Sequence, residues 1–253
     1  MLKFSPANAK IEALKNVEAI KPYLQKRKVF SLDLLSGFSC PYANNCLSRA
    51  IVTDTGRHIK DGPNTQFRCF SATQELIFAN VYKLRKHNFD LLKSTPYKYE
   101  LIKASLPAKM GVCRIHVGGD FFNEDYMLAW AKIAHDNPSI LFYAYTKSLN
   151  FWIKNREFFS ELDNFVLTAS YGGRLDHLIS EHGLRSAKVI LSEDQANGLT
   201  IDHDDSAAAD PARRNDDFAL LIHGVQPAGT EANKALQVLK KNKVKHSYTR
   251  AKV

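Results

Sequence analysis

Three of the four cysteines in this sequence occur within or shortly after one loop-like segment. Cys40 and Cys46 lie in SGFSCPYANNCLSRA, which follows the apolar run at residues 29–35, and Cys69 comes 23 positions after Cys46. Pro41 and two asparagines favour turns, so this loop could close on a metal. Thiolates are ligands for iron–sulfur clusters and for zinc. The spacing indicates a metal centre, although unrelated cysteines are the alternative because paired CxxC motifs are absent.

The fourth cysteine, Cys113, lies in a different context. It is inside the apolar segment GVCRIHV, where a strand would place it on the same side as Ile115 and Val117. Free cysteine is often a small buried apolar residue, and we expect this for Cys113. It is also the candidate for a fourth metal ligand.

The composition is that of an ordinary globular protein. With 253 residues, 45% hydrophobic and 24% charged, the chain can fill one large domain. No stretch approaches the roughly 18 to 20 apolar residues of a membrane span, and the N-terminus lacks the apolar region of a secretory signal. We therefore expect a single cytoplasmic domain without membrane contact. Clustered thiols in that compartment serve metals or catalysis more often than disulfides.

The net charge of +9 suggests nucleic acid as a candidate partner. The excess of basic residues is concentrated in segments 21–28, 83–103 and 239–252. A surplus of this kind usually belongs to a solvated surface, and no recognition motif for nucleic acid is present. The basic tail at 241–253 is expected to be flexible.

Strand-like and helix-like segments alternate about six times after residue 28. Nearly continuous apolar strands in such an order predict an α/β fold with a parallel sheet. We expect a (β/α) barrel or partial barrel of about six or more parallel strands wrapped by helices over residues 29–240, or alternatively an open doubly wound sheet. Residues 1–28 are expected to form a helical extension, 64–92 one long helix, and 202–217 a surface loop.

Polar residues follow several predicted strands, where ligands bind in folds of this kind. Asp120 follows two glycines and could accept a hydrogen bond from a ligand amine or cap the next helix. Lys147 could bind a carboxylate or phosphate, or transfer protons. For His116 the alternative is a core histidine whose hydrogen bonds are satisfied within the protein. For Lys147 the alternative is a solvated loop lysine. The candidate catalytic or ligand-binding residues are His116, Gly118, Gly119, Asp120, Lys147, Arg174, His177 and His223.

The segment from Cys113 to Trp152 resembles the central part of the gene-product-eighty-eight-like family of bacteriophage proteins. That family has an R-I-H-x-S-G-D-F motif followed by F-Y-A-Y-T-K. The matching residues here are Arg114, Ile115, His116, Gly119, Asp120, Phe121, Phe122 and Tyr126, followed by Phe142–Lys147. SYGGRLDHLI is similar to a later family segment, and the resemblance runs from about Ser31 to Lys241. It implies a phage protein in the host cytoplasm.

In that family the loop after the first strand resembles C-P-x-x-x-x-C-x-x-x-C. This sequence has Cys40 and Cys46, but Ala50 occupies the third position, so Cys69 is the available substitute. The resemblance further suggests a distant likeness to radical S-adenosylmethionine enzymes. Those have a three-cysteine loop after the first strand of a partial barrel and a G-G-E-like motif after the second, here Gly118–Asp120. Their CxxxCxxC spacing is absent, so the likeness concerns architecture.

These features together predict an iron–sulfur protein. Cys40, Cys46 and Cys69 would hold a 4Fe–4S or 3Fe–4S cluster at the carboxyl ends of the strands, with S-adenosylmethionine as candidate cofactor and an unidentified small molecule as ligand. Whether the protein catalyses a reaction is left open. The alternatives are a zinc site closed by Cys113 or a histidine, and a metal-stabilised protein that binds nucleic acid through a basic face. Nothing in the sequence indicates the oligomeric state.

Overall fold

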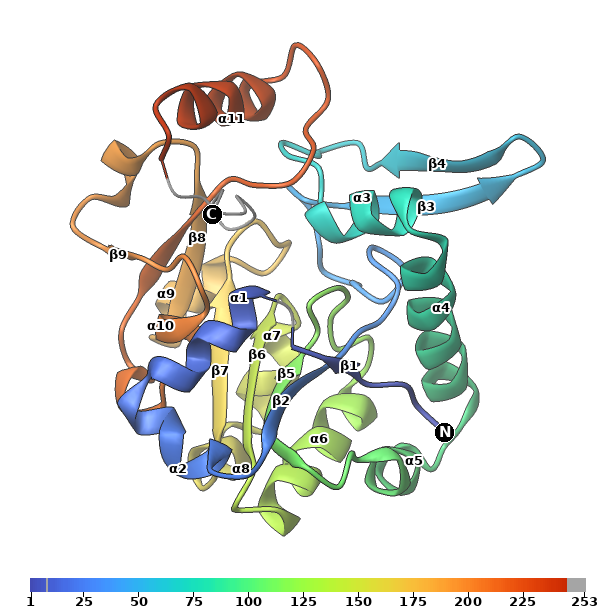
Figure 1. The fold of residues 1–253 in the computed structure, drawn as a ribbon, viewed down its shortest axis with the longest axis vertical. Helices are drawn as coiled ribbons and strands as arrows, with labels where there is room; N and C mark the ends of the chain where they lie inside the picture. Colours follow the sequence, from blue (N-terminus) through green and yellow to red (C-terminus); the bar gives the residue numbers. More distant parts are fainter. Residues whose placement is uncertain (8, 245–253) are drawn as a thin grey trace.

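The computed structural model describes residues 1–7 and 9–244, and within them eight strands form one sheet (Figure 1). The strand order is β1-β2-β5-β6-β7-β8-β10-β9. The first strand is antiparallel to the second, and every other neighbouring pair is parallel. The strands are β1 (Ser5–Pro6), β2 (Lys28–Leu32), β5 (Met110–Ile115), β6 (Leu141–Thr146), β7 (Phe165–Ser170), β8 (Ser186–Ile190), β9 (Thr200–Ile201) and β10 (Phe218–Leu221).

The strands β2, β5, β6, β7, β8 and β10 stand in the sheet in the order in which they occur in the chain. The prediction of an α/β fold with six or more parallel strands is confirmed. In the described residues β1 and β9 are the two edges and do not pair, so the sheet is open there. The helices are α1 (Ala9–Glu12), α2 (Lys21–Leu24), α3 (Phe70–Ile77), α4 (Ala79–Ser94), α5 (Lys98–Ser105), α6 (Glu124–Asp136), α7 (Leu149–Lys154), α8 (Arg156–Ser160), α9 (His177–Glu181), α10 (Ser206–Ala209) and α11 (Glu231–Lys241).

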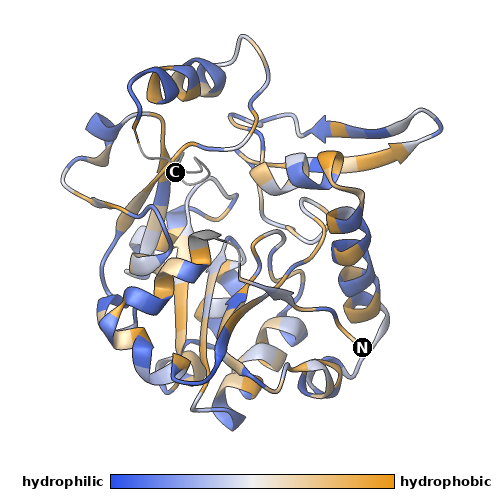
Figure 2. Ribbon diagram, viewed as in Figure 1, coloured by the Kyte–Doolittle hydropathy of each residue, from blue (hydrophilic) through white to orange (hydrophobic). Residues whose placement is uncertain are grey.

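The two faces of the sheet are covered by different parts of the chain. On one face α4, α5, α6 and α8 pack against the strands, in a core that contains the fully buried Trp130 and Phe142. On the other face the N-terminal segment and α10 contribute Ile11, Leu14 and Ala208 to a second core. The ribbon coloured by hydropathy shows apolar strands at the centre and helices with one apolar side (Figure 2). The N-terminal segment is helical, as expected, and it forms part of a core.

The part of segment 202–217 around α10 is buried, so the prediction of a surface loop is wrong there, whereas Ala212 and residues 215–217 are exposed. Asp205 is fully buried, and Ala207–Ala209 are at most 1% exposed. The Asp205 carboxylate pairs with Arg114 of β5 and accepts a hydrogen bond from the Tyr143 hydroxyl at 2.9 Å. Burial of an acidic side chain requires such partners. A stretch of aspartates and alanines shows no apolar period that would reveal these long-range contacts.

A hairpin that the sequence did not predict lies between Cys46 and Cys69. Its strands, β3 (Ser48–Thr53) and β4 (Gly56–Asp61), project from the body of the protein (Figure 1). The backbone N–H of Gly62 donates to the Leu47 carbonyl at 2.6 Å, so the chain returns to the point where it left. The hairpin thereby brings Cys69 back toward the cysteine loop.

The expected single helix at 64–92 is also wrong. The segment forms α3 and α4, which are separated at Phe78, a residue in extended conformation with φ −106° and ψ 103°. The break lets the two helices take different directions, so that Arg85 of α4 pairs with Glu75 of α3, which in turn contacts Ser36 at the start of the cysteine loop.

No helix within residues 1–7 and 9–244 combines the length and the apolar character needed to cross a membrane. The predicted flexible tail falls mostly on residues 245–253, which lie outside the described part of the chain.

Ala208→Leu tests the burial of α10. Ala208 is 1% exposed, so a leucine there overpacks the core and should lower the free energy of unfolding by about 1–3 kcal/mol. Ala212→Leu is the matched control, because Ala212 lies in the same segment and is exposed; its effect should stay within about 0.5 kcal/mol. Urea denaturation measures both. Equally small effects would contradict the placement of α10 in the core.

Candidate functional site

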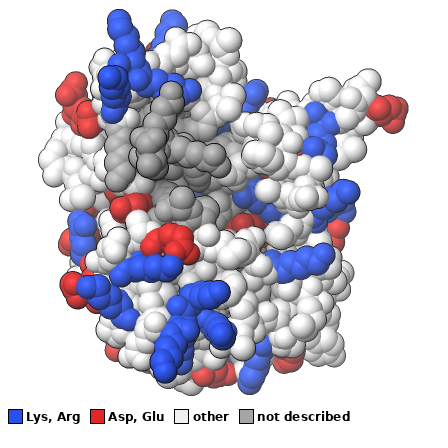
Figure 3. All heavy atoms as spheres, viewed as in Figure 1, with Lys and Arg blue, Asp and Glu red and all other residues white. Residues whose placement is uncertain are grey.

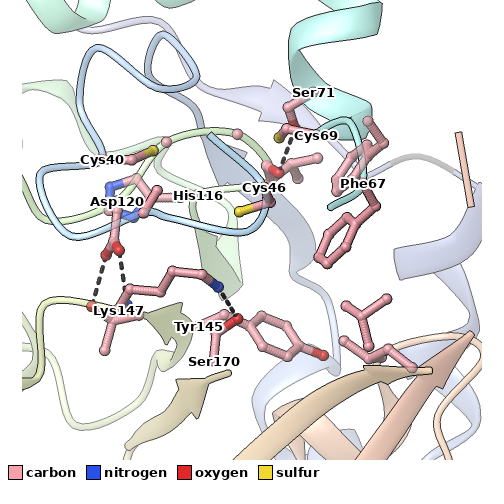
Figure 4. Close-up of a pocket in the computed structure, with 18 of the residues that line it drawn as sticks. Cys40, Cys46, Phe67, Cys69, Ser71, His116, Asp120, Tyr145, Lys147 and Ser170 are labelled. Carbon is pink, nitrogen blue, oxygen red and sulfur yellow. Dashed lines mark hydrogen bonds between the residues drawn. The ribbon is translucent and has the colours of Figure 1, made fainter. Parts of the chain in front are cut away.

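A cavity of about 170 Å³ lies at the carboxyl ends of the parallel strands (Figure 4). Its wall combines the cysteine loop, the segment leading into α3, and the ends of β5, β6, β7, β8 and β10. This is the position at which ligands bind in parallel α/β folds. Six of the eight predicted catalytic or ligand-binding residues line this cavity: His116, Gly118, Gly119, Asp120, Lys147 and His223.

Cys40, Cys46 and Cys69 all line the cavity as free, partly buried cysteines (Figure 4). Burial is the main cause that raises the pKa of Cys40 well above its ordinary value, followed by the charge of Asp120 and by the neighbouring thiols. Burial, and next Cys46, raises the pKa of Cys69 to about 11. The three sulfur atoms are therefore close enough to interact electrostatically. No group of three or more metal-ligating side chains among the described residues is already arranged to hold an ion.

A buried ion pair anchors the start of the cysteine loop. Glu75 of α3 accepts hydrogen bonds from the backbone N–H of Ser36 at 3.0 Å and from its hydroxyl at 2.8 Å. The same carboxylate pairs with Arg85 of α4 at 3.1 Å, and both side chains are at most 2% exposed. Burial raises the pKa of Glu75 above its ordinary value, against the effect of these partners. Because α3 begins directly after Cys69, this pair holds the helix that follows Cys69 against the loop that carries Cys40.

The glycine turn after β7 supports the middle of the loop. The backbone N–H groups of Asn44 and Asn45 donate to the Gly172 carbonyl at 3.2 and 2.9 Å. Gly172 has φ +92°, a conformation that favours glycine. The Asp176 carboxylate accepts the N–H groups of Gly172 and Gly173, both at 2.8 Å. The glycines of SYGGRLDH thus hold the cysteine loop through backbone hydrogen bonds.

Three of the predicted site residues lie away from the cavity. Arg174 and His177 are exposed and are not among the residues that line it. Cys113 is fully buried, and it belongs with Ile115 to the core on the face of the sheet that α4, α5, α6 and α8 cover. The expectation that Cys113 is a small buried residue is confirmed, and this position gives no support to its role as a fourth metal ligand.

Cys69 comes close to the strand that carries Ala50, the residue at the third cysteine position of the family pattern. Ala50 lies in β3 with its side chain buried. The Cys69 backbone N–H donates to the hydroxyl of Ser48, two residues earlier on that strand, at 3.3 Å. This proximity agrees with Cys69 as the substitute thiol.

Asp120 connects the turn after β5 to the end of β6. One carboxylate oxygen accepts the Thr146 hydroxyl and the Phe121 N–H, both at 2.7 Å, and the other accepts the backbone N–H of Lys147 at 2.8 Å. Burial raises the pKa of Asp120 to about 6, against the opposing effect of these hydrogen bonds. It does not cap α6, a role that belongs to Asn123.

His116 directly follows β5 and has a left-handed conformation with φ +70°, which is uncommon for a residue other than glycine. Its Nε2 lies 2.9 Å from the Tyr126 hydroxyl, whereas Nδ1 is buried and has no hydrogen-bond partner. Burial, and next the charge of Arg114, lowers the pKa of His116 to about 3. The imidazole is therefore neutral at neutral pH, and the hydrogen-bonding capacity of its Nδ1 is not satisfied within the protein.

The two glycines after His116 allow close packing of the turn. A Cβ atom at Gly118 would lie 2.9 Å from Arg85 and Ser71 atoms, and one at Gly119 would lie 2.7 Å from Leu34 and Ser39 atoms. Their lack of side chains thus brings the turn against α3, α4 and the cysteine loop.

Lys147 is 9% exposed, and its Nζ donates to the Ser170 hydroxyl at 2.6 Å. His223 also lines the cavity, with its ring 4.7 Å from that of Phe70. Two lining residues, Ser170 and Tyr145, were missed as site residues. Alternation along the strand FYAYT could have indicated Tyr145, because it places this residue on the same face as Lys147.

The basic residues of segment 83–103 are only in part available to a nucleic acid. Arg85 is buried in its pair with Glu75, Lys86 pairs with Asp90, and Lys98 is 7% exposed. On the face drawn in Figure 3, Lys and Arg side chains are interspersed with Asp and Glu. Nucleic-acid binding stays a prediction.

The fold and the site define an α/β protein with a cysteine-lined cavity at the carboxyl ends of a parallel sheet. The chain belongs to the Gene product 88 family, whose model matches residues 2–241. It is 26% identical over 122 residues to the Gene 88 protein of Mycobacterium phage L5, covering 44% of each chain. The Gene 88 protein of Mycobacterium phage D29 is 25% identical over 122 residues, covering 44% of this chain and 43% of that protein.

These matches span less than half the length of either relative. No solved structure matches the chain significantly. The predicted resemblance to a phage family is confirmed, and the family match begins earlier than the Ser31 expected from the motifs.

His116→Asn should reduce the acid sensitivity of the protein. The folded state keeps His116 unprotonated down to about pH 3, whereas an unfolded histidine takes up a proton below its ordinary pKa of 6.5. The stability that His116 contributes is therefore fully present above pH 6.5 and is lost as the pH falls, by about 2 kcal/mol at about pH 5. Asparagine tolerates the positive φ.

Urea denaturation at neutral pH and at about pH 5 measures this contribution. The decrease on acidification should be smaller in His116→Asn than in the wild type, and unchanged in His177→Asn, which alters an exposed histidine. The same decrease in the wild type and in His116→Asn would show that His116 does not titrate in this way.

Proposed function

We propose that this protein binds an iron–sulfur cluster through Cys40, Cys46 and Cys69 and acts on a small molecule in the adjoining cavity. The observation that carries the proposal is that these cysteines, all within residues 40–69, line the same cavity at the carboxyl ends of the strands. When bound, the cluster would supply electron transfer, and three protein thiolates would leave a coordination position for another ligand.

The chemistry of the cavity wall is compatible with such a group. Burial favours the neutral form of the Cys40 and Cys69 thiols by raising the pKa of each. Binding of a cationic centre would therefore be coupled to the release of protons. Since the thiols are not already arranged around an ion, loading would draw the loop containing Cys40 and Cys46 toward Cys69.

We further propose a partial (β/α) barrel and an enzyme of the radical S-adenosylmethionine type. The sequential order of β2, β5, β6, β7, β8 and β10 supports this, because open doubly wound sheets reverse their strand order at a switch point. The turn at Gly118–Asp120, which lines the cavity beside the thiols, is then the candidate contact for S-adenosylmethionine. His116 and Lys147 would bind and orient the substrate.

Zinc is the alternative occupant of the same thiols. A structural zinc site needs a fourth ligand, and Cys113 lies on the opposite face of the sheet. The histidines that line the cavity, His116 and His223, are the candidates in its place. A zinc-stabilised protein of this kind that also binds nucleic acid is the remaining alternative, and its binding would weaken steeply with salt.

The test is anaerobic purification of the full chain with analysis of iron, zinc and acid-labile sulfide. We expect a brown protein with several irons and sulfides per chain. Cys40→Ser, Cys46→Ser and Cys69→Ser should each reduce iron and sulfide to background, because each removes a thiolate. Cys113→Ala is the matched control, since it removes a thiol outside the cavity, and it should keep the full content.

A colourless, metal-free preparation would contradict the proposal, as would equal loss of iron in Cys113→Ala. Stoichiometric zinc without sulfide would favour the alternative. A change in the visible spectrum on addition of S-adenosylmethionine supports an enzyme of that type, and an unchanged spectrum favours electron transfer or a structural role.

A further inference from the structure

We propose that the cavity binds a small organic carboxylate, whose anionic group pairs with Lys147 and whose apolar body packs against the ends of β8 and β10. This rests on the proposed function, because it names the class of small molecule that the same cavity accepts. The anion site itself is made by side chains other than the cysteines.

Lys147 is the cation of the cavity wall that has no carboxylate partner among the described residues. The other two cations of the wall are both paired, Arg68 with Asp61 at 2.6 Å and Arg114 with Asp205. Lys147 is 9% exposed, and the contact of its Nζ is the neutral hydroxyl of Ser170. Burial of an ammonium group without a counter-ion is unfavourable. An anionic ligand group in contact with the Lys147 Nζ would supply that counter-ion.

Two other residues of the same wall carry a polar atom that makes no hydrogen bond. The Tyr145 hydroxyl and Nδ1 of His116 are both buried and have no hydrogen-bond partner. Figure 4 shows the Lys147 side chain reaching toward Ser170, with the ring of Tyr145 beside them. The cavity wall thus combines a cation with two residues that each carry a buried polar atom not satisfied within the protein.

The charge balance favours a monoanion. The carboxylate of Asp120 interacts electrostatically with Lys147. A carboxylate ligand adds one negative charge near Asp120, whereas a dianionic phosphate adds two and is repelled more strongly.

One part of the wall is mainly apolar. Val189 of β8, Leu220 of β10, Ile222 and Phe67 line it together with His223, whereas His116, Lys147 and Ser170 belong to or directly follow β5, β6 and β7. A ligand that fills the cavity therefore has one charged end and an apolar body. An apolar surface with a few polar groups that fix orientation is typical of small-molecule sites.

Isothermal titration calorimetry on the full chain tests the proposal with 3-phenylpropionate as the probe, and with its methyl ester and phenyl phosphate for comparison. The carboxylate should bind saturably at millimolar concentrations, and the ester at least about tenfold more weakly, because it lacks the charge. Tighter binding of phenyl phosphate would overturn the assignment of a monoanion site.

Lys147→Met should weaken binding of the carboxylate by about tenfold or more, and Lys147→Arg should restore most of it. Lys188→Met is the matched control, because Lys188 lies on β8 and is exposed, and it should bind as the wild type does. Circular dichroism and thermal unfolding verify that each variant is folded.

Equal affinity for acid and ester in the wild type, or the absence of saturable binding, would overturn the proposal without any variant. An affinity for the carboxylate that is unchanged in Lys147→Met would overturn it as well. Titration of protein freed of metal by a chelator separates this inference from the proposed function. If the protein binds the carboxylate but never takes up iron, only the proposed iron–sulfur cluster is refuted. If it takes up iron but binds the acid and its ester equally well, only the proposed anion site is refuted.

Discussion

The buried carboxylate of Glu75 is the constraint on which the site depends. It connects Ser36, where the cysteine loop begins, to α3, which starts directly after Cys69, and Arg85 of α4 balances its charge. A buried carboxylate that lost these partners would be costly, so the loop and the two helices must assemble together. Cys40 and Cys69 reach the same cavity because of this arrangement and because the hairpin β3–β4 returns the chain to its starting point.

The two faces of the sheet have separate tasks. The face covered by α4, α5, α6 and α8 is a conventional apolar core, and it also contains Cys113. The opposite face is apolar where the N-terminal helices and α10 cover it and polar at the carboxyl ends of the strands, where the cavity lies. Between these two regions the Arg114–Asp205 pair is buried. Charges near the cavity are thus satisfied within the protein except at Lys147, for which we propose a ligand.

Much of the fold could be predicted from local patterns, because parallel strands are continuously apolar and α6 has an acidic first turn after Asn123. The positions of the cysteine loop and of Gly118–Asp120 could be predicted for the same reason, because both segments follow apolar strands. The role of residues 202–217 could not, since acidic side chains become buried only through partners distant in the sequence, such as Arg114 with Asp205. Alternation correctly placed Cys113 on the same face as Ile115, whereas the contribution of Ser170 depends on its contact with Lys147 across neighbouring strands.

The central claim is that three thiolates bind one multinuclear iron centre. X-ray absorption at the iron edge of the anaerobically isolated full chain tests it most directly, because it reports the ligand atoms and the neighbouring metals together. We expect sulfur ligands and iron–iron scattering, both absent from Cys69→Ser. Iron coordinated by oxygen and nitrogen alone, or a spectrum that Cys69→Ser leaves unchanged, would contradict the claim.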